Sequence, residues 1–405
     1  MDRYIVVSSD CHAGLPADGY RQYLDPGLRE TFDQVLPIQI EMIKNAEKSF
    51  LIQEINEEWR KDIQQELTGA WDYDQRIKML DNDGIAAEII FPDGITEQNT
   101  PPFGAGLGLP TENIVPELQW AGARAHNRWL AELVANNPAR HLGVAAVPLL
   151  WDIDEAIKEV KWCADNGLRS VLIPHMTNQF SCYHHTRYHP FWQACEALNI
   201  VVNFHSGATP QKNYFGEKYP EDLDKEHHPG AMGVFVSEVM WWTYRPISFM
   251  LWGGVFEKFP KLKVAITEAG TAWMIPPMLR MLDHNYHDVM FSAKLGDFTS
   301  HLSMSPSDYF RRNVGIGASC MPRPDAEVRH DIGLDQIMWG SDYPHPEGTW
   351  PKTKSQLYDT FVDLPETEVA AMLGENAVRF YGLDRDALAA IAANIGPTKS
   401  ELKSA

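Results

Sequence analysis

Short apolar runs recur along this chain, and a helical or polar segment separates each run from the next. Most runs have the length and the Val, Ile and Leu content of a buried parallel strand, and each ends at Gly, Pro or polar residues. The eight predicted strands are residues 4–7, 86–91, 142–147, 170–174, 200–204, 262–267, 313–317 and 336–340. Strands that alternate with helices form a parallel sheet, and eight such units close into a barrel. We therefore predict a (β/α)8 barrel, the TIM barrel.

The chain has 405 residues, which exceeds the usual size of one domain, but α/β barrels with insertions reach this length. We assign residues 1–384 to the barrel because they hold all eight predicted strands. Two segments, about 20–80 and 208–233, are too long for simple connections, so we interpret them as insertions at the C-terminal face. Residues 385–405 follow as a C-terminal tail. We expect the insertions to shape the mouth of the barrel.

The formal net charge of −20 argues against two classes of partner, because nucleic acids and anionic membrane surfaces are themselves negative. No apolar run approaches the about twenty residues of a membrane span, and no basic segment with an apolar signal core is present. Five scattered cysteines without a CxxC pair are typical of a reducing compartment. We therefore expect a cytoplasmic protein, by default a homodimer, that acts on a small molecule.

Side chains that bind metals stand where the predicted strands end. These residues are Asp10, His12, His175, His205, Glu268 and Asp342. Asp10 and His12 alternate along the chain, so both point to one face of the first strand. The C-terminal strand ends of a barrel meet at one rim, where active sites lie. Each residue alone has an ordinary alternative as a turn, helix cap or core residue, but together they predict a site for Zn, Fe or Mn.

Several motifs at these positions are similar to those of a known family. They are Asp10-x-His12, His205-Ser206-Gly207, Thr267-Glu268-Ala269-Gly270, the run from Trp339 to His345, and the closing segment 372–383. The chain resembles the amidohydrolase superfamily, in the branch with aminocarboxymuconate semialdehyde decarboxylase, aromatic-acid decarboxylases and assorted hydrolases. The resemblance implies a TIM barrel with Asp10, His12, His205 and Asp342 as the primary metal ligands.

Two positions depart from that family pattern. The better-known decarboxylases carry His-x-His or Glu-x-His on strand one, and they often use a strand-six histidine as acid or base. This chain has Asp10 and Glu268 at these places. Extra carboxylates make the site harder, which suits Mn or Fe at least as well as Zn. Glu268 is either a ligand or the general base.

The sequence is compatible with a site for one metal ion and with a site for two. Superfamily members with two metals draw a ligand from strand four, so a binuclear site would include His175 and Glu268. His175 is otherwise a rim residue that contacts the substrate. We expect His345 to contact the primary ligands or the substrate. Trp241 is a candidate for the apolar wall of a substrate pocket.

We expect hydrolysis by a metal-activated water. The metal would lower the pKa of water from about 15.7 towards 7, and Asp342 or Glu268, beside His205, would handle its proton. An ester, thioester, lactone or amide of a small organic acid would be the substrate. The alternative is non-oxidative decarboxylation of an aromatic or unsaturated acid. A binding protein on an inactive barrel is a third reading, but it predicts missing ligands, and the central four are present.

Overall fold

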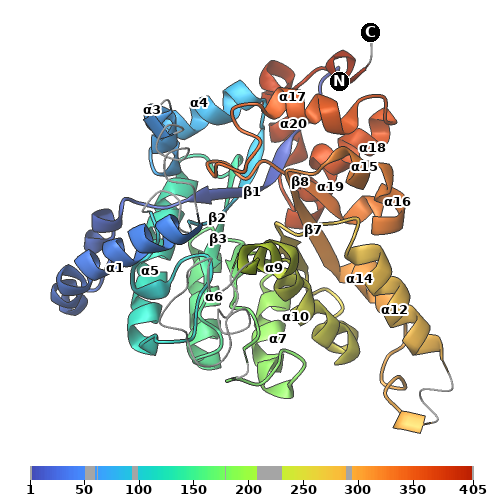
Figure 1. Ribbon diagram of the computed structural model, residues 1–405, viewed down its shortest axis with the longest axis horizontal. Helices are drawn as coiled ribbons and strands as arrows, with labels where there is room; N and C mark the ends of the chain where they lie inside the picture. The colour runs from blue at the N-terminus through green and yellow to red at the C-terminus, as the bar shows by residue number, and fades with distance from the viewer. Residues whose placement is uncertain are drawn as a thin grey trace.

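A computed structural model describes residues 2–50, 60–61, 63–93, 99–177, 179–207, 230–288 and 294–403. Eight parallel strands follow one another around a barrel in chain order, which confirms the predicted TIM-barrel fold (Figure 1). They are β1 (Val7–Ala13), β2 (Ala87–Pro92), β3 (His141–Ala146), β4 (Ser170–Leu172), β5 (Val201–His205), β6 (Val264–Thr267), β7 (Val314–Ser319) and β8 (Ile337–Gly340). Seven of them overlap the predicted strands closely because their buried sequences are apolar.

Helices surround the strands, as Figure 1 shows. Within the described ranges the α-helices are α1 (Arg29–Phe50), α3 (Gln64–Leu67), α4 (Tyr73–Asp83), α5 (Pro116–Ala135), α6 (Ile153–Asp165), α7 (His189–Ala197), α9 (Ala231–Glu238), α10 (Trp241–Trp252), α11 (Val255–Lys258), α12 (Ile275–His287), α14 (Pro306–Asn313), α15 (Arg323–Glu327), α16 (Arg329–Ile332), α17 (Thr353–Phe361), α18 (Glu366–Ala370), α19 (Asn376–Tyr381) and α20 (Arg385–Ile395). None of them is long and apolar enough to cross a membrane.

The first strand lies further along the chain than the apolar pattern predicts. The expected strand covers residues 4–7, whereas β1 runs from Val7 to Ala13 and includes Asp10 and His12. Polar residues extend this strand because its neighbours pair with it on both sides. The register against β2 shifts between Ser8 and Cys11, and the Ser8 hydroxyl donates to the Asp10 carbonyl at 2.7 Å. Such bulges re-aim side chains near active sites.

The barrel closes where β8 and the residues after it meet β1. The Asp342 amide donates to the Asp10 carbonyl at 2.8 Å, and the His12 amide donates to the Tyr343 carbonyl at 2.7 Å. Gly340 permits this approach, because a Cβ at that position would lie 2.8 Å from the Cβ of Asp10. We call this junction the β1–β8 seam. It brings residues more than 300 positions apart into backbone contact.

The two predicted insertions are described to different extents. The segment 20–80 contains α1, α3 and most of α4, and Figure 1 shows α1 projecting from the side of the barrel. Its residues 51–59 and 62 lie outside the described residues. The second insertion, 208–233, falls outside them up to residue 229, so only the start of α9 belongs to the structure.

The predicted C-terminal tail packs against the barrel. Leu388 and Ala392 of α20 are fully buried, and Leu402 is nearly so. The Tyr4 amide donates to the Pro397 carbonyl at 2.9 Å, so the tail lies beside the N-terminal segment. Both chain ends lie at the same side of the molecule in Figure 1. The tail therefore contributes buried apolar surface.

We predict that Leu388→Ala lowers the free energy of unfolding by about 2–5 kcal/mol, because a fully buried leucine leaves a cavity when truncated. Urea unfolding of the metal-free protein, followed by circular dichroism, measures the change. Leu295→Ala is the control, since Leu295 is 72% exposed and its truncation should change the value by less than about 0.5 kcal/mol. Equal values for the two variants would contradict the packing of α20.

Candidate metal centre

Four of the predicted residues converge at the carboxyl ends of the strands. Asp10 and His12 come from β1, His205 ends β5, and Asp342 follows β8. The Nε2 atom of His12 lies 3.4 Å from Asp10 Oδ1 and 3.2 Å from Asp342 Oδ1. The Nε2 atom of His205 lies 3.2 Å from Asp10 Oδ1. All four side chains are 1% exposed or less, so this is a buried cluster of two imidazoles and two carboxylates.

Backbone carbonyls orient both histidines. The Nδ1 atom of His12 lies 3.1 Å from the Pro92 carbonyl at the end of β2, and Nδ1 of His205 lies 3.2 Å from the Ser206 carbonyl. A neutral imidazole that donates through Nδ1 keeps its Nε2 lone pair free. That lone pair of His12 then faces the carboxylates of Asp10 and Asp342, and that of His205 faces Asp10. This second hydrogen bond is the usual way in which proteins prepare a histidine for a metal.

Several buried polar atoms in the cluster lack a hydrogen-bond partner among the described residues. They are Nε2 of His12 and both carboxylate oxygens of Asp342. Buried polar atoms without partners are costly, and a carboxylate more so than a neutral group. A divalent cation would satisfy all of these atoms at once. Asp10, His12 and His205 also offer ligand atoms within 4.8 Å of one another, and so do His12, Asp342 and His345. The donor set therefore fits a metal ion.

The electrostatics of the cluster favour a positive charge at its centre. Burial and His345 oppose protonation of His12, yet the carboxylates of Asp10 and Asp342 raise its pKa to about 9. Burial also opposes ionisation of Asp10, but the two histidines hold the pKa of that carboxyl well below its usual range. The field of the carboxylates thus attracts a cation, which a metal ion supplies in place of the proton.

Glu268 and Asp342 occupy unusual backbone conformations. Their φ values are 54° and 60°, in the left-handed region that residues with a Cβ rarely adopt. Such strain is kept where the surroundings impose it, commonly at functional sites. The Ser206 hydroxyl donates to Glu268, whose side chain is 26% exposed. Burial and the nearby Asp342 raise the pKa of Glu268 to about 7. Glu268 is thus a carboxyl group at the open edge of the cluster.

His345 lies against the predicted ligands. Its ring stacks on that of His12, with centroids 3.9 Å apart and planes 16° apart. Its Nδ1 atom lies 3.1 Å from Asp342 Oδ1, and its Nε2 atom lies 3.4 Å from Asp93 Oδ1. The structure therefore places His345 in contact with two of the predicted ligands, and its contact with substrate stays a prediction.

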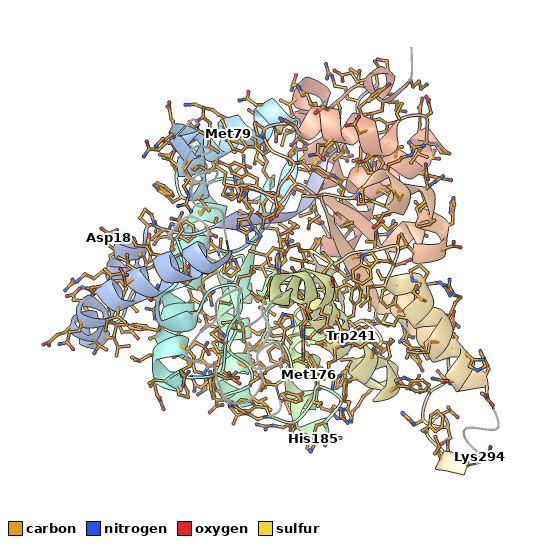
Figure 2. The ribbon with its side chains drawn as sticks, viewed as in Figure 1. Asp18, Met79, Met176, His185, Trp241 and Lys294 are labelled. Carbon is orange, nitrogen blue, oxygen red and sulfur yellow. The ribbon has the colours of Figure 1, made fainter. Side chains whose placement is uncertain are left out.

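Two further predicted residues lie outside the cluster of four. His175 is buried, faces the backbone of His205 and Trp242, and has a pKa that burial lowers to about 4. It joins none of the ligand groups formed by the described residues, so its part in a second metal site stays a prediction. Trp241, labelled in Figure 2, begins α10, and its side chain is 40% exposed.

A third candidate ligand group lies among the described residues, in addition to the two named above. It consists of three carboxylates, those of Glu268, Asp342 and the exposed Glu347.

Sequence reasoning missed two residues at this site. The Ser319 hydroxyl, at the end of β7, donates to Oδ2 of Asp10, and Asp93 approaches His345 directly after β2. Both stand at strand ends, so the rule that selected the candidate ligands also selects these two positions. A serine and a turn aspartate before glycine are common enough that neither attracts attention in a sequence.

A comparison with known protein families covers almost the whole chain. The family model described as Amidohydrolase matches residues 9–383. The chain belongs to the amidohydrolase family.

Several named relatives and solved structures are similar to this chain. The chain is 22% identical over 321 residues, 78% of either chain, to 2-amino-3-carboxymuconate-6-semialdehyde decarboxylase of Dictyostelium discoideum. It is 26% identical over 282 residues to γ-resorcylate decarboxylase of a Rhizobium species, which covers 67% of this chain and 76% of that one. In structure it is similar to 5-carboxyvanillate decarboxylase of Novosphingobium aromaticivorans with bound manganese, with a TM-score of 0.64, 15% identity, and 94% and 97% of the two chains covered.

These comparisons contradict the expected reaction. We expected hydrolysis because the carboxylates around the metal would assist a water molecule. The named relatives in this family are instead decarboxylases of carboxylic acids, and no water is added in a non-oxidative decarboxylation. The number of carboxylates does not predict the reaction, because the same barrel and the same donor types serve several reactions.

We predict that the double variant Asp10→Ala/His12→Ala binds no metal, whereas the natural protein binds about one divalent ion per chain. Both residues of β1 contribute donors to the buried cluster, so their loss leaves too few ligands. Elemental analysis of the untagged protein measures the metal content. Cys182→Ser is the control, because Cys182 is only partly buried and belongs to none of the candidate ligand groups formed by the described residues. Metal retained by the double variant would contradict the assignment.

Proposed function

We propose that this protein is a metal-dependent, non-oxidative decarboxylase of a small aromatic or unsaturated carboxylic acid. The observation that carries the proposal is the buried cluster of Asp10, His12, His205 and Asp342 at the active end of the barrel. It occurs in a chain whose named relatives act on γ-resorcylate and on 2-amino-3-carboxymuconate semialdehyde. Hydroxylated benzoates are therefore the first substrates to test.

We propose that the four residues of this cluster hold one divalent ion. Two imidazoles and two carboxylates accept Mn, Fe or Zn, and manganese is the first choice because a similar solved structure contains it. When bound, the ion would supply positive charge that attracts an acidic substrate and stabilises negative charge on it. The residues of this chain then have to exclude water, orient the ring and deliver a proton.

The proton is the central requirement of the reaction. When the bond between the ring carbon and the carboxylate breaks, its electron pair stays on the ring carbon and carbon dioxide leaves. One proton must then reach that carbon. Glu268 is placed for this task, because its carboxyl is partly exposed while the four clustered side chains are 1% exposed or less. Ser206 donates to it and holds its orientation. We assign Glu268 as the acid that protonates the ring carbon.

The start of α10 packs against the loop that follows Glu268. The sulfur of Met240 accepts a hydrogen bond from the Gly270 amide at 3.1 Å, two residues after Glu268. Tyr244 donates to the Gly270 carbonyl, so the loop and the helix are joined twice. Trp241, next to Met240, is therefore near the open edge of the cluster. We propose that its indole contacts the aromatic ring of the substrate.

The homodimer and the cytoplasmic location stay predictions.

The reaction itself is tested with manganese-loaded protein and 2,6-dihydroxybenzoate among other hydroxylated benzoates. We expect release of carbon dioxide, and in deuterium oxide one deuterium on the ring carbon that lost the carboxyl, because the proton comes from an exchangeable acid. Chromatography and mass spectrometry of the product measure both. An acid product that carries oxygen from labelled water would show hydrolysis and would overturn the proposal.

We predict that Glu268→Gln lowers kcat by about 10²–10⁴-fold, since the amide cannot deliver a proton. The metal content should stay unchanged, which separates loss of the acid from loss of a ligand. Glu327→Gln is the control, because Glu327 is exposed on α15 and pairs with Arg323. A Glu268→Gln variant that has lost its metal would assign Glu268 to the ligands instead.

A further inference from the structure

A buried ion pair lies directly beneath the metal centre. The guanidinium of Arg76, on α4, is fully buried and donates to both oxygens of Glu88 on β2, at 2.6 and 2.7 Å. Its Nη1 atom also donates to the backbone carbonyls of His12, at 2.9 Å, and Gly69, at 3.0 Å. One side chain therefore joins α4 and β2 to the strand that carries two of the ligands.

Neighbouring groups keep both partners of this pair in their charged forms. Glu88 Oε1 also lies 2.8 Å from Nδ1 of His141, the first residue of β3. Although burial opposes ionisation, Arg76 and His141 lower the pKa of Glu88 to about 2. The pair is therefore ionised at neutral pH. A planar guanidinium is suited to this place because it can bind a carboxylate through two parallel hydrogen bonds and still donate elsewhere.

Arg76 contacts both sides of the β1–β8 seam. Its Cζ atom lies 5.6 Å from the centre of the Tyr343 ring, and Tyr343 directly follows the ligand Asp342. On the other side of the seam, the His12 amide is bonded to the Tyr343 carbonyl while the His12 carbonyl accepts from Arg76. Met79, three residues further along α4 and labelled in Figure 2, packs in one buried cluster with Cys11 and Tyr343. α4 thus packs against the seam with apolar and charged contacts.

We propose that Arg76 is a positioning residue for the metal centre: it fixes the backbone of His12 and the β1–β8 seam, so that Asp10, His12 and Asp342 converge on one ion. This inference rests on the metal site proposed above. Arg76 touches no ligand side chain and acts through the backbone of His12 and through Tyr343. Loss of such outer contacts typically weakens metal binding by about 10–100-fold.

If the Arg76–Glu88 pair only stabilised the fold, removing both of its charges would leave metal binding unchanged. Replacing a buried ion pair by uncharged residues of similar size often leaves stability unchanged, whereas removing one partner leaves an unpaired charge. The variant Arg76→Met/Glu88→Gln removes both charges and keeps an acceptor for His141. It therefore separates the stability of the barrel from the geometry of the metal site. Arg76→Lys keeps the charge but cannot bind Glu88 through a fork and the His12 carbonyl together.

The experiment measures the Kd of Mn²⁺ for the metal-free full-length proteins by calorimetry, with circular dichroism to confirm folding. We expect about 10–100-fold weaker binding in both variants and a changed Mn²⁺ electron paramagnetic resonance spectrum. Arg329→Lys is the matched control, because Arg329 is buried, bonds Glu368 at 2.6 Å and donates to the Ala326 carbonyl, away from the site. Its Kd should equal that of the natural protein.

Two results would overturn the inference, and a third would overturn the proposed metal site on which it rests. A folded variant of Arg76 that binds Mn²⁺ within about twofold of the natural protein would show that Arg76 does not position the ligands. Loss of the fold in both variants would assign the pair a structural role only. Absence of Mn²⁺, Fe²⁺ and Zn²⁺ binding in the natural protein would contradict the proposed metal centre itself, which distinguishes failure of that proposal from failure of this inference.

Discussion

Buried negative charge at the β1–β8 seam is the constraint on which the rest of this structure depends. Asp10 and Asp342 both lie within 3.4 Å of Nε2 of His12 and are shielded from water. Carboxylates in such a place repel each other unless a cation lies between them. The barrel keeps them there because its closure hydrogen bonds join the backbones of the same two residues. The fold and the demand for a cation are therefore one feature.

The seam also explains how distant parts of the chain affect the chemistry. Its position depends on a bulge in β1, on Gly340, and on the Arg76–Glu88 pair beneath it. Glu268 belongs to a different part of the rim, held by Ser206 and by the contacts of Gly270 with α10. Separate contacts thus hold the proposed ligands and the proposed acid, which suits proton delivery because each group can be oriented independently of the other.

The expected reaction was wrong, whereas the predicted metal-binding role of the site residues stays a prediction. Residue types at strand ends predict where a metal binds, because ligation depends on few atoms at short range. The reaction depends on which group reaches the substrate and from which side, and one barrel supports many such arrangements. The sequence did not reveal Ser319, Asp93 or the Arg76–Glu88 pair, because their roles arise from contacts between segments far apart in the chain.

By itself, the sequence determined the barrel, most strand positions and the presence of carboxylates and imidazoles at the strand ends. Apolar runs of strand length and the polar residues that end them are local signals, and strand order follows from them. Only the tertiary structure decided that β1 reaches Ala13, that the ring of His345 stacks on that of His12, and that His175 stands outside the candidate ligand groups of the described residues. These features depend on the register at the seam, which long-range hydrogen bonds set and no local pattern encodes.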